Sequence, residues 1–181
     1  MSFRRLPTEI DEVVLIEPTV HGDERGFFVE TFRESELEEL GIEAHFVQDN
    51  HSRSGARVLR GIHMQAGQAK LVRCPKGRIF DVAVDLRPDS ATFKRWEGYE
   101  LDDVSHRQLF IPDGFGHGFC VLSDSADVLY RVSSYYDPEL ERGVAWDDPE
   151  IAVDWPIRDP VVSDRDRRAP RLDQVEAALR R

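Results

Sequence analysis

The sequence has few cysteines, no long apolar stretch and fewer basic than acidic residues, and each shortage excludes a class of protein. Two thiols, Cys74 and Cys120, are too few for a disulfide framework in 181 residues, and both lie in apolar runs that predict buried, reduced side chains. The N-terminal segment MSFRRLPTEI lacks the apolar core of a signal peptide, and no later segment approaches the length of a membrane span. These features predict a cytoplasmic protein that does not cross a membrane.

Basic side chains and several catalytic motifs are also scarce. The chain has 35 acidic residues against 24 lysines and arginines, for a formal net charge of -11, so we expect neither nucleic acid nor an anionic membrane as a partner. Glycine-rich phosphate loops of the Walker or dinucleotide type are absent, as is the GxSxG elbow of serine hydrolases. An anionic ligand would therefore have to meet a local group of cations, and a serine or cysteine nucleophile is disfavoured.

What is present is a series of short runs rich in β-branched and aromatic residues, separated by turn segments such as PKG, RPDS and PDGFG. This pattern is typical of antiparallel, all-β proteins. Only residues 34–40 and 172–180 have the spacing and composition of helices. We expect strands within residues 13–18, 26–32, 44–50, 57–64, 70–74, 78–86, 107–112, 117–122 and 127–136.

The length fits one domain that spans residues 1–181. Many short strands in one domain must close into a barrel or stack as two sheets, because an open sheet leaves its edges unpaired. We therefore expect a jelly-roll β-barrel with short peripheral helices. From about Asp154 the sequence becomes rich in proline and charge, which predicts an irregular tail over the barrel before a short helix.

The segment VLRGIHMQ carries two candidate site residues, Arg60 and His63. Strict alternation places them on opposite faces of a strand, so both can reach one cavity only if the strand bulges at Gly61 between them. Taken alone, His63 is more typical of a hydrogen-bonded core histidine. A cupin-type metal site would need a second histidine two residues later, where Gln65 stands instead.

Two other segments carry candidate polar side chains. In IPDGFGHGFCVL we interpret His117 as part of a glycine-rich turn that leads into a strand, where a hydrogen-bonded structural role explains it as well as binding does. In DVLYRVSSYY, alternation places Tyr130 on the face of Val128 and Val132, with Arg131 on the other face. The simplest interpretation of Tyr130 alone is a core aromatic with its hydroxyl at the rim.

Seven blocks of the sequence, from about Ile16 to Asp173, can be compared with known families. They are GDERGFFVETF, FVQDNHSRS, VLRGIHMQ, KLVRCPKGRIFDVAVDLR, IPDGFGHGFCVLSD, LYRVSSYYDPELERGVAWDDPEIAVDWP and SDRDRRAPRLD. Together, and in this order, they resemble the dTDP-4-dehydrorhamnose 3,5-epimerase family. The resemblance implies a cupin-like jelly roll and a homodimer in which an N-terminal strand is exchanged. It also implies action on dTDP-4-dehydro-6-deoxy-D-glucose without a metal or an organic cofactor.

Position by position, the resemblance implies four catalytic residues. His63 is similar to the family's general base and Asp166 of SDRD to its partner carboxylate, while Lys70 is expected near the sugar's keto oxygen. Tyr130 is the expected acid on the opposite face of the ring.

The resemblance implies that Arg25 and Glu30 reach the nucleotide across the dimer, that Arg60 lies by the diphosphate and that Tyr135 faces thymine. The full set of implied binding residues is Arg25, Glu30, Gln48, Asn50, Arg60, His117 and Tyr135.

These residue types suit the implied chemistry. Inversion of a carbon beside a ketone needs a base, a group that stabilises the enolate and an acid on the other face. An imidazole titrates near neutrality, a phenol holds its proton at neutral pH, and the planar fork of arginine matches a diphosphate.

Two features leave other functions open. The loop after His63 is shorter than in many relatives and begins with Met64 where an aromatic residue is common, and similar GQAK segments occur in relatives that invert one carbon only. A mono-epimerase or a ketoisomerase of another dTDP-deoxysugar therefore remains an alternative. So do a noncatalytic sugar-nucleotide-binding jelly roll and, less favoured, a metal-dependent cupin.

Overall fold

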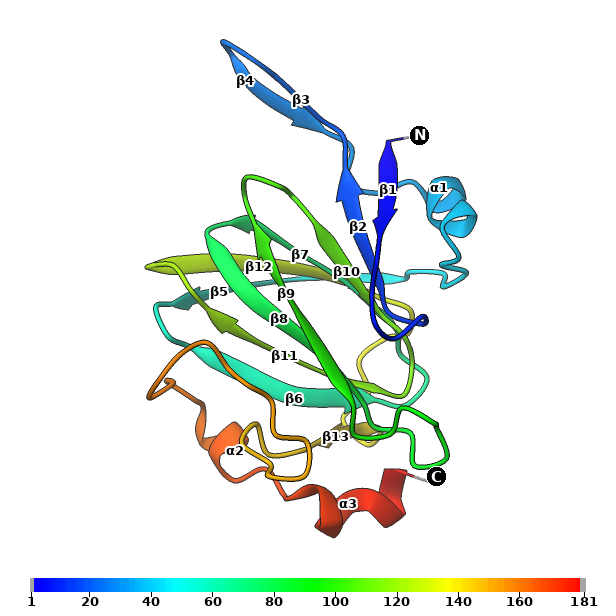
Figure 1. Ribbon diagram of the computed structural model, residues 1–181, viewed down its shortest axis with the longest axis vertical. Helices are drawn as coiled ribbons and strands as arrows, with labels where there is room; N and C mark the ends of the chain where they lie inside the picture. Colours follow the sequence, from blue (N-terminus) through cyan, green and yellow to red (C-terminus); the bar gives the residue numbers. More distant parts are fainter. Residues whose placement is uncertain (1, 180–181) are drawn as a thin grey trace.

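The computed structural model describes residues 2–179, which form thirteen strands and three short helices (Figure 1). The expectation of a mostly β protein with few helices is confirmed. The first sheet has six strands in the order β1 (Phe3–Leu6), β2 (Val14–Pro18), β10 (Gln108–Ile111), β7 (Lys70–Lys76), β12 (Ser125–Val132) and β5 (Gln48–Gly55). The second has five strands in the order β13 (Glu141–Gly143), β6 (Leu59–Gln65), β11 (Phe115–Val121), β8 (Arg78–Asp85) and β9 (Trp96–Asp102).

The two large sheets pack against each other and are not closed into one barrel. Each keeps two edge strands, β1 and β5 in the first and β13 and β9 in the second. Between them lies a core to which both sheets contribute, for example Val72 and Leu109 from the first and Ala83 and Phe119 from the second. Alternation explains this core, because every second residue of each strand points to the inner face.

The outer face of each sheet is covered by a different part of the chain. The segment around α1 (Glu34–Glu39) places Leu37 and Ile42 against β2, β7 and β10. The C-terminal part of the chain, with α2 (Asp164–Arg167) and α3 (Leu172–Leu179), lies beside β6 and β13 in Figure 1 and buries Ile151 and Leu172 against the second sheet. The expected terminal helix matches α3, although its last residue, Arg180, lies outside the described residues.

A third, two-stranded sheet forms a hairpin of β3 (Val20–Asp23) and β4 (Gly26–Val29). The hairpin extends away from the rest of the chain in Figure 1. Its Phe27 and Phe28 side chains are exposed, which is unusual for two adjacent aromatic residues. None of the helices within residues 2–179 has the length and apolar character that a membrane span requires.

Both cysteines are buried and unpaired, as the sequence predicts, and burial raises the pKa of each thiol to about 12.

The sequence patterns missed four strands and one helix. Of these, β3 is fully exposed and β9 alternates acidic with apolar residues, so neither has the apolar run that marks a strand. The expected strand at 44–50 begins only at Gln48.

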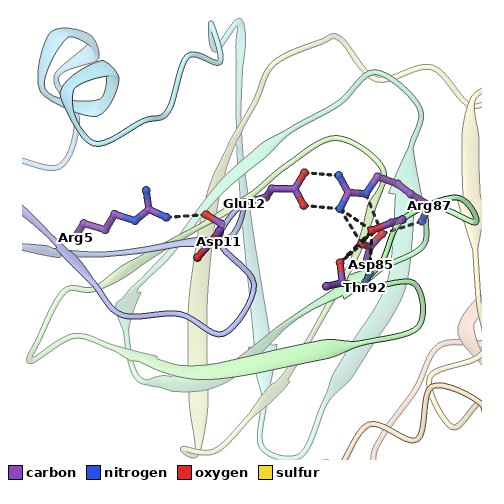
Figure 2. A network of polar contacts seen from close by, with 7 residues as sticks. Arg5, Asp11, Glu12, Asp85, Arg87 and Thr92 are labelled. Atoms are coloured by element: carbon purple, nitrogen blue, oxygen red, sulfur yellow. Dashed lines mark hydrogen bonds and ion pairs between the residues drawn. The ribbon is translucent and has the colours of Figure 1, made fainter.

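A polar network joins the end of β8 to the loop before β2 (Figure 2). The Asp85 carboxylate accepts hydrogen bonds from the Arg87 guanidinium and from the Ser90 and Thr92 hydroxyls, at 2.6–2.9 Å. The same guanidinium donates two hydrogen bonds of 2.6 Å to Glu12. Every oxygen of Asp85 therefore has partners, although the residue is fully buried.

Candidate active site

A cavity of about 670 Å³ opens between the two large sheets. Its walls come from β5, β7 and β12 of the first sheet, from β6, β11 and β13 of the second, and from the segment that contains α2. This volume is in the range of pockets that hold small organic ligands. Eight of the implied site residues line the cavity, namely Gln48, Asn50, Arg60, His63, Lys70, His117, Tyr130 and Asp166.

An irregularity in β6 brings Arg60 and His63 to the same cavity. Opposite β11, His63 pairs with His117 and Arg60 pairs with Phe119, so β6 carries one more residue than its partner between these pairs. Gly61 lies in this bulge with a φ of 135°, a conformation that L side chains rarely adopt. The expected bulge at Gly61 is confirmed.

Asp166 reaches His63 because the chain before α2 is tied to the start of β6. Val161 forms a parallel bridge with Val58, and its carbonyl accepts a hydrogen bond of 3.0 Å from the backbone of Leu59. Two residues later Ser163 caps α2 by accepting a hydrogen bond of 3.1 Å from the backbone of Asp166. The cap and the bridge together hold the Asp166 side chain toward β6.

The His63 Nε2 and Asp166 Oδ1 atoms are 2.6 Å apart, although the residues are separated by 103 positions in the sequence. Burial alone would raise the pKa of Asp166, but hydrogen bonds from His63 and Ser163 and the charge of His63 lower it. The carboxylate therefore stays ionised beside the imidazole. No hydrogen bond within residues 2–179 engages His63 Nδ1, so this atom can face a ligand.

Lys70 begins β7 and is buried in the cavity wall. Its Nζ donates a hydrogen bond of 3.3 Å to the His63 carbonyl. Burial lowers the pKa of Lys70 from 10.5 to about 8, even though the carboxylates of Glu141 and Asp81 act in the opposite direction. An ammonium group that has lost most of its water is well suited to attract a developing negative charge.

Tyr130 and Arg60 lie on different strands of the cavity. Tyr130 packs against the inner core from β12, and burial raises the pKa of its phenol while the charge of Arg60 opposes that shift. The phenol therefore keeps its proton at neutral pH. Arg60 donates a hydrogen bond of 3.0 Å to Ser54 and is otherwise exposed, so most of its guanidinium donors are free for an anionic ligand.

The expected strand at 117–122 is confirmed, but β11 already begins at Phe115, so our interpretation of His117 as part of the preceding turn is wrong. The residue lies on the inner face between Phe115 and Phe119, and its Nε2 is 2.7 Å from the Asp81 Oδ1 of β8. Both side chains are buried, and the Asp81 Oδ2 has no partner among residues 2–179. Sequence reasoning missed Asp81, although an acidic residue at an inward position of the apolar run IFDVAV was a usable signal.

Sequence reasoning also missed a group of three polar residues that line the cavity, Tyr136, Glu141 and Arg165. The Glu141 carboxylate accepts a hydrogen bond of 2.8 Å from Tyr136 and forms an ion pair of 2.7 Å with Arg165. Burial would raise the pKa of Glu141, but the bonds from Arg165 and Tyr136 lower it. These three residues tie the loop after β12 to β13 and α2 beside Asp166.

Three implied binding residues do not line the cavity. Arg25 lies in the turn of the β3–β4 hairpin, paired with Asp23, and Glu30 follows β4. Tyr135 is largely exposed, while the adjacent Tyr136 lines the cavity. Within residues 2–179, no group of three or more His, Cys, Asp or Glu side chains is arranged to hold a metal ion.

The arrangement can move protons around a carbonyl compound. It combines an imidazole oriented by a carboxylate, an ammonium, a protonated phenol and a guanidinium bound only to Ser54 among residues 2–179, all around one cavity. Such a set can remove a proton beside a carbonyl group, stabilise the enolate and return a proton from another side.

Comparisons with known proteins agree with this chemistry. The sequence profile described as dTDP-4-dehydrorhamnose 3,5-epimerase matches residues 7–174. The dTDP-4-dehydrorhamnose 3,5-epimerase of Escherichia coli is 50% identical over 173 residues, which are 93% of this chain and 94% of that protein. A dTDP-4-dehydrorhamnose 3-epimerase of Streptomyces niveus is 43% identical over 97% of this chain and 87% of its own length.

The fold agrees as well. A crystal structure of dTDP-6-deoxy-D-glucose-3,5-epimerase from Legionella pneumophila, in complex with dTDP-4-keto-L-rhamnose, superimposes with a TM-score of 0.94. It is 48% identical, and the match covers 98% of this chain and 96% of that one. Both the profile and the identity extend over nearly the whole chain. The chain therefore belongs to the dTDP-4-dehydrorhamnose 3,5-epimerase family.

Proposed function

We propose that the protein inverts C3 and C5 of dTDP-4-dehydro-6-deoxy-D-glucose to give dTDP-4-dehydro-L-rhamnose. The observation that carries this proposal is the His63–Asp166 pair in a cavity that also holds Lys70 and Tyr130. Membership of the family supports the substrate class. The proposed reaction needs no metal or organic cofactor, because each step is a proton transfer beside an existing ketone.

In the proposed mechanism, His63 Nδ1 removes a proton from the carbon next to the C4 ketone. Asp166 holds the Nε2 proton and stabilises the imidazolium that forms, as a carboxylate does in hydrolytic triads. The Lys70 ammonium offsets the charge that develops on the enolate oxygen. Tyr130 then gives its phenolic proton to the opposite face of the same carbon, and the sequence repeats at the second carbon.

The proposed binding mode uses the cations and amides around the cavity. Arg60 pairs with the diphosphate through its guanidinium fork, and Gln48, Asn50 and His117 contact the sugar nucleotide from the cavity wall. Tyr135 is proposed to face thymine only if the loop after β12 rearranges, because its side chain is exposed in this structure.

We propose that the single domain is a cupin-like jelly roll that forms a homodimer by exchange of its N-terminal region. The exposed Phe27 and Phe28 on an extended hairpin support this arrangement, since a partner subunit would cover them. Arg25 and Glu30 would then complete the partner's nucleotide site. Light scattering should give twice the chain mass, and replacing both phenylalanines with serine should give monomers.

The decisive experiment is incubation with dTDP-4-dehydro-6-deoxy-D-glucose in heavy water. Deuterium should enter both C3 and C5, as read by nuclear magnetic resonance of the sugar. Label at one carbon only would favour a mono-epimerase, an alternative supported by the similarity to the 3-epimerase of Streptomyces niveus. No label at all would favour a noncatalytic binding protein.

The base assignment is tested with His63→Ala. The variant should lose exchange at both carbons by about 100-fold or more while it still binds dTDP. His51→Ala is the matched control, because His51 is an exposed residue of β5 that does not line the cavity. Full exchange activity in the His63 variant would contradict the assignment.

A further inference from the structure

After each inversion, the proposed mechanism leaves His63 and Tyr130 in protonation states that cannot support another inversion. His63 has gained the proton taken from carbon, and Tyr130 has lost the proton given to the opposite face. The sugar has kept its composition, so the mismatch lies entirely in the protein. Before a second inversion one proton must leave His63 and one must reach Tyr130.

His117 is a neighbour of both His63 and Tyr130. It is directly opposite His63 in the β6–β11 pair, a position that brings the Cβ atoms of antiparallel neighbours within about 5 Å. Its ring centroid is 6.5 Å from that of Tyr130, and all three side chains line the same cavity. His117 is only 7% exposed, so bulk water has little access to it.

The hydrogen bonding of His117 leaves one nitrogen available. Nε2 is bound to Asp81, and no hydrogen bond within residues 2–179 engages Nδ1. Asp81 is fully buried, and its Oδ2 has no partner in the described part of the chain, which is a costly arrangement for a side chain that serves packing alone. A carboxylate at this place stabilises a transient charge on His117, as Asp166 does for His63.

We propose that His117, positioned by Asp81, returns the proton from His63 to Tyr130 between successive inversions. The His63 side chain is 28% exposed, so its imidazolium exchanges protons with solvent before the return, and in heavy water deuterium still enters both carbons. His117 then accepts a proton at Nδ1 from the His63 imidazolium, directly or through one water, and becomes an imidazolium beside Asp81. It then gives that proton to the Tyr130 phenolate, so all three groups regain their initial states. Burial raises the pKa of Tyr130, which makes the return of its proton favourable.

The main test is Asp81→Asn. The amide oxygen still accepts the hydrogen bond from His117 Nε2, but the negative charge is lost. In a single-turnover reaction, we expect the first inversion to stay within about threefold of wild type and the second to slow by about tenfold or more, so that singly inverted sugar accumulates. Asp166→Asn is the contrasting variant, because it should slow the first inversion.

A second variant covers the case in which Asp81→Asn does not fold. In His117→Ala, added imidazole should restore the second inversion more than the first. Equal slowing of both inversions in either variant, or no accumulation of singly inverted sugar, would overturn the proposal. This inference rests on the proposed function. If the wild-type enzyme incorporates deuterium at one carbon only, the proposed double inversion is wrong. The return of the proton is then tested by multiple turnovers of Asp81→Asn, in which turnovers after the first should be slower than the first.

Discussion

Two of the regions in which the molecule buries acidic side chains differ in how many hydrogen-bond partners surround the carboxylate. In the network at the end of β8, Asp85 has four different donor groups around its carboxylate, and Arg87 has two carboxylate partners. Beside the cavity, and within residues 2–179, Asp81 has one partner and one unpartnered oxygen, and Lys70 has only a long hydrogen bond to a backbone carbonyl.

The pKa directions follow this difference. Burial alone would raise the pKa of Asp85, but its hydrogen bonds lower it to about 2, so the carboxylate is stabilised where it lies. The pKa of Lys70 is lowered to about 8, because burial outweighs its carboxylate neighbours. A fully satisfied network stabilises the fold, whereas incompletely satisfied groups remain free to interact with a ligand.

The largest expected effect is the loss of activity in Lys70→Met. Removal of the ammonium should reduce the epimerisation rate by about 100- to 1000-fold. The wild-type rate should fall as the pH rises through about 8, since Lys70 then loses its charge, and the variant should lack this decrease. Initial rates across a pH series measure both effects. An unchanged rate would remove Lys70 from the proposed mechanism.

The same variant should be more stable than the wild type. Because the folded pKa of about 8 lies below the ordinary value of 10.5, the cost of burying the charge is fully present below pH 8 and disappears as the pH rises toward 10.5. Urea unfolding at pH 7 should show a gain of about 3 kcal/mol that vanishes near pH 10.5. Lys76→Met, at the exposed end of the same strand, should change neither property.

Asp85→Ala should give the opposite result. We expect a loss of about 3 kcal/mol in the free energy of unfolding, because Ser90 and Thr92 lose their acceptor and Arg87 loses its buried partner. The activity of the folded fraction should stay near that of wild type. Glu12→Gln is the control, since Glu12 is half exposed and its loss should cost about 0.5 kcal/mol. If Asp85→Ala lost much activity but no stability, the Asp85 network would not serve stability in the way that distinguishes it from the cavity.

Gly61→Ala should reduce both activity and stability through one residue. An added Cβ would lie 2.5 Å from the Cα of Gly118 and 3.1 Å from the His117 carbonyl, and the φ of 135° disfavours any side chain. We expect a loss of about 2 kcal/mol in stability together with reduced activity, because β6 must shift away from β11. Gly55→Ala, which has open space around its Cβ, should change stability by less than about 0.5 kcal/mol. Similar behaviour of both variants would show that the bulge is not needed.

Local patterns sufficed for much of the fold. Apolar runs located most strands of the two large sheets, and alternation correctly placed Tyr130 on the face of Val128 and required a bulge near Gly61. Strands without an apolar run, such as β3 and β13, were missed because hydrogen bonding to a neighbour, and not burial, makes them strands. The placement of His117 in a turn failed because glycines in β11 allow close packing against β6.

The sequence by itself determined the family, the β composition and the residue types of the site, because these depend on the order of short motifs. Only the tertiary structure decided which carboxylate meets which imidazole. Asp166 reaches His63 across 103 positions through the bridge at Val161, and Asp81 reaches His117 across 36 positions through strand pairing. Sequence spacing carries no information about such distances, since they are set by how the two sheets pack and where the backbone hydrogen bonds form.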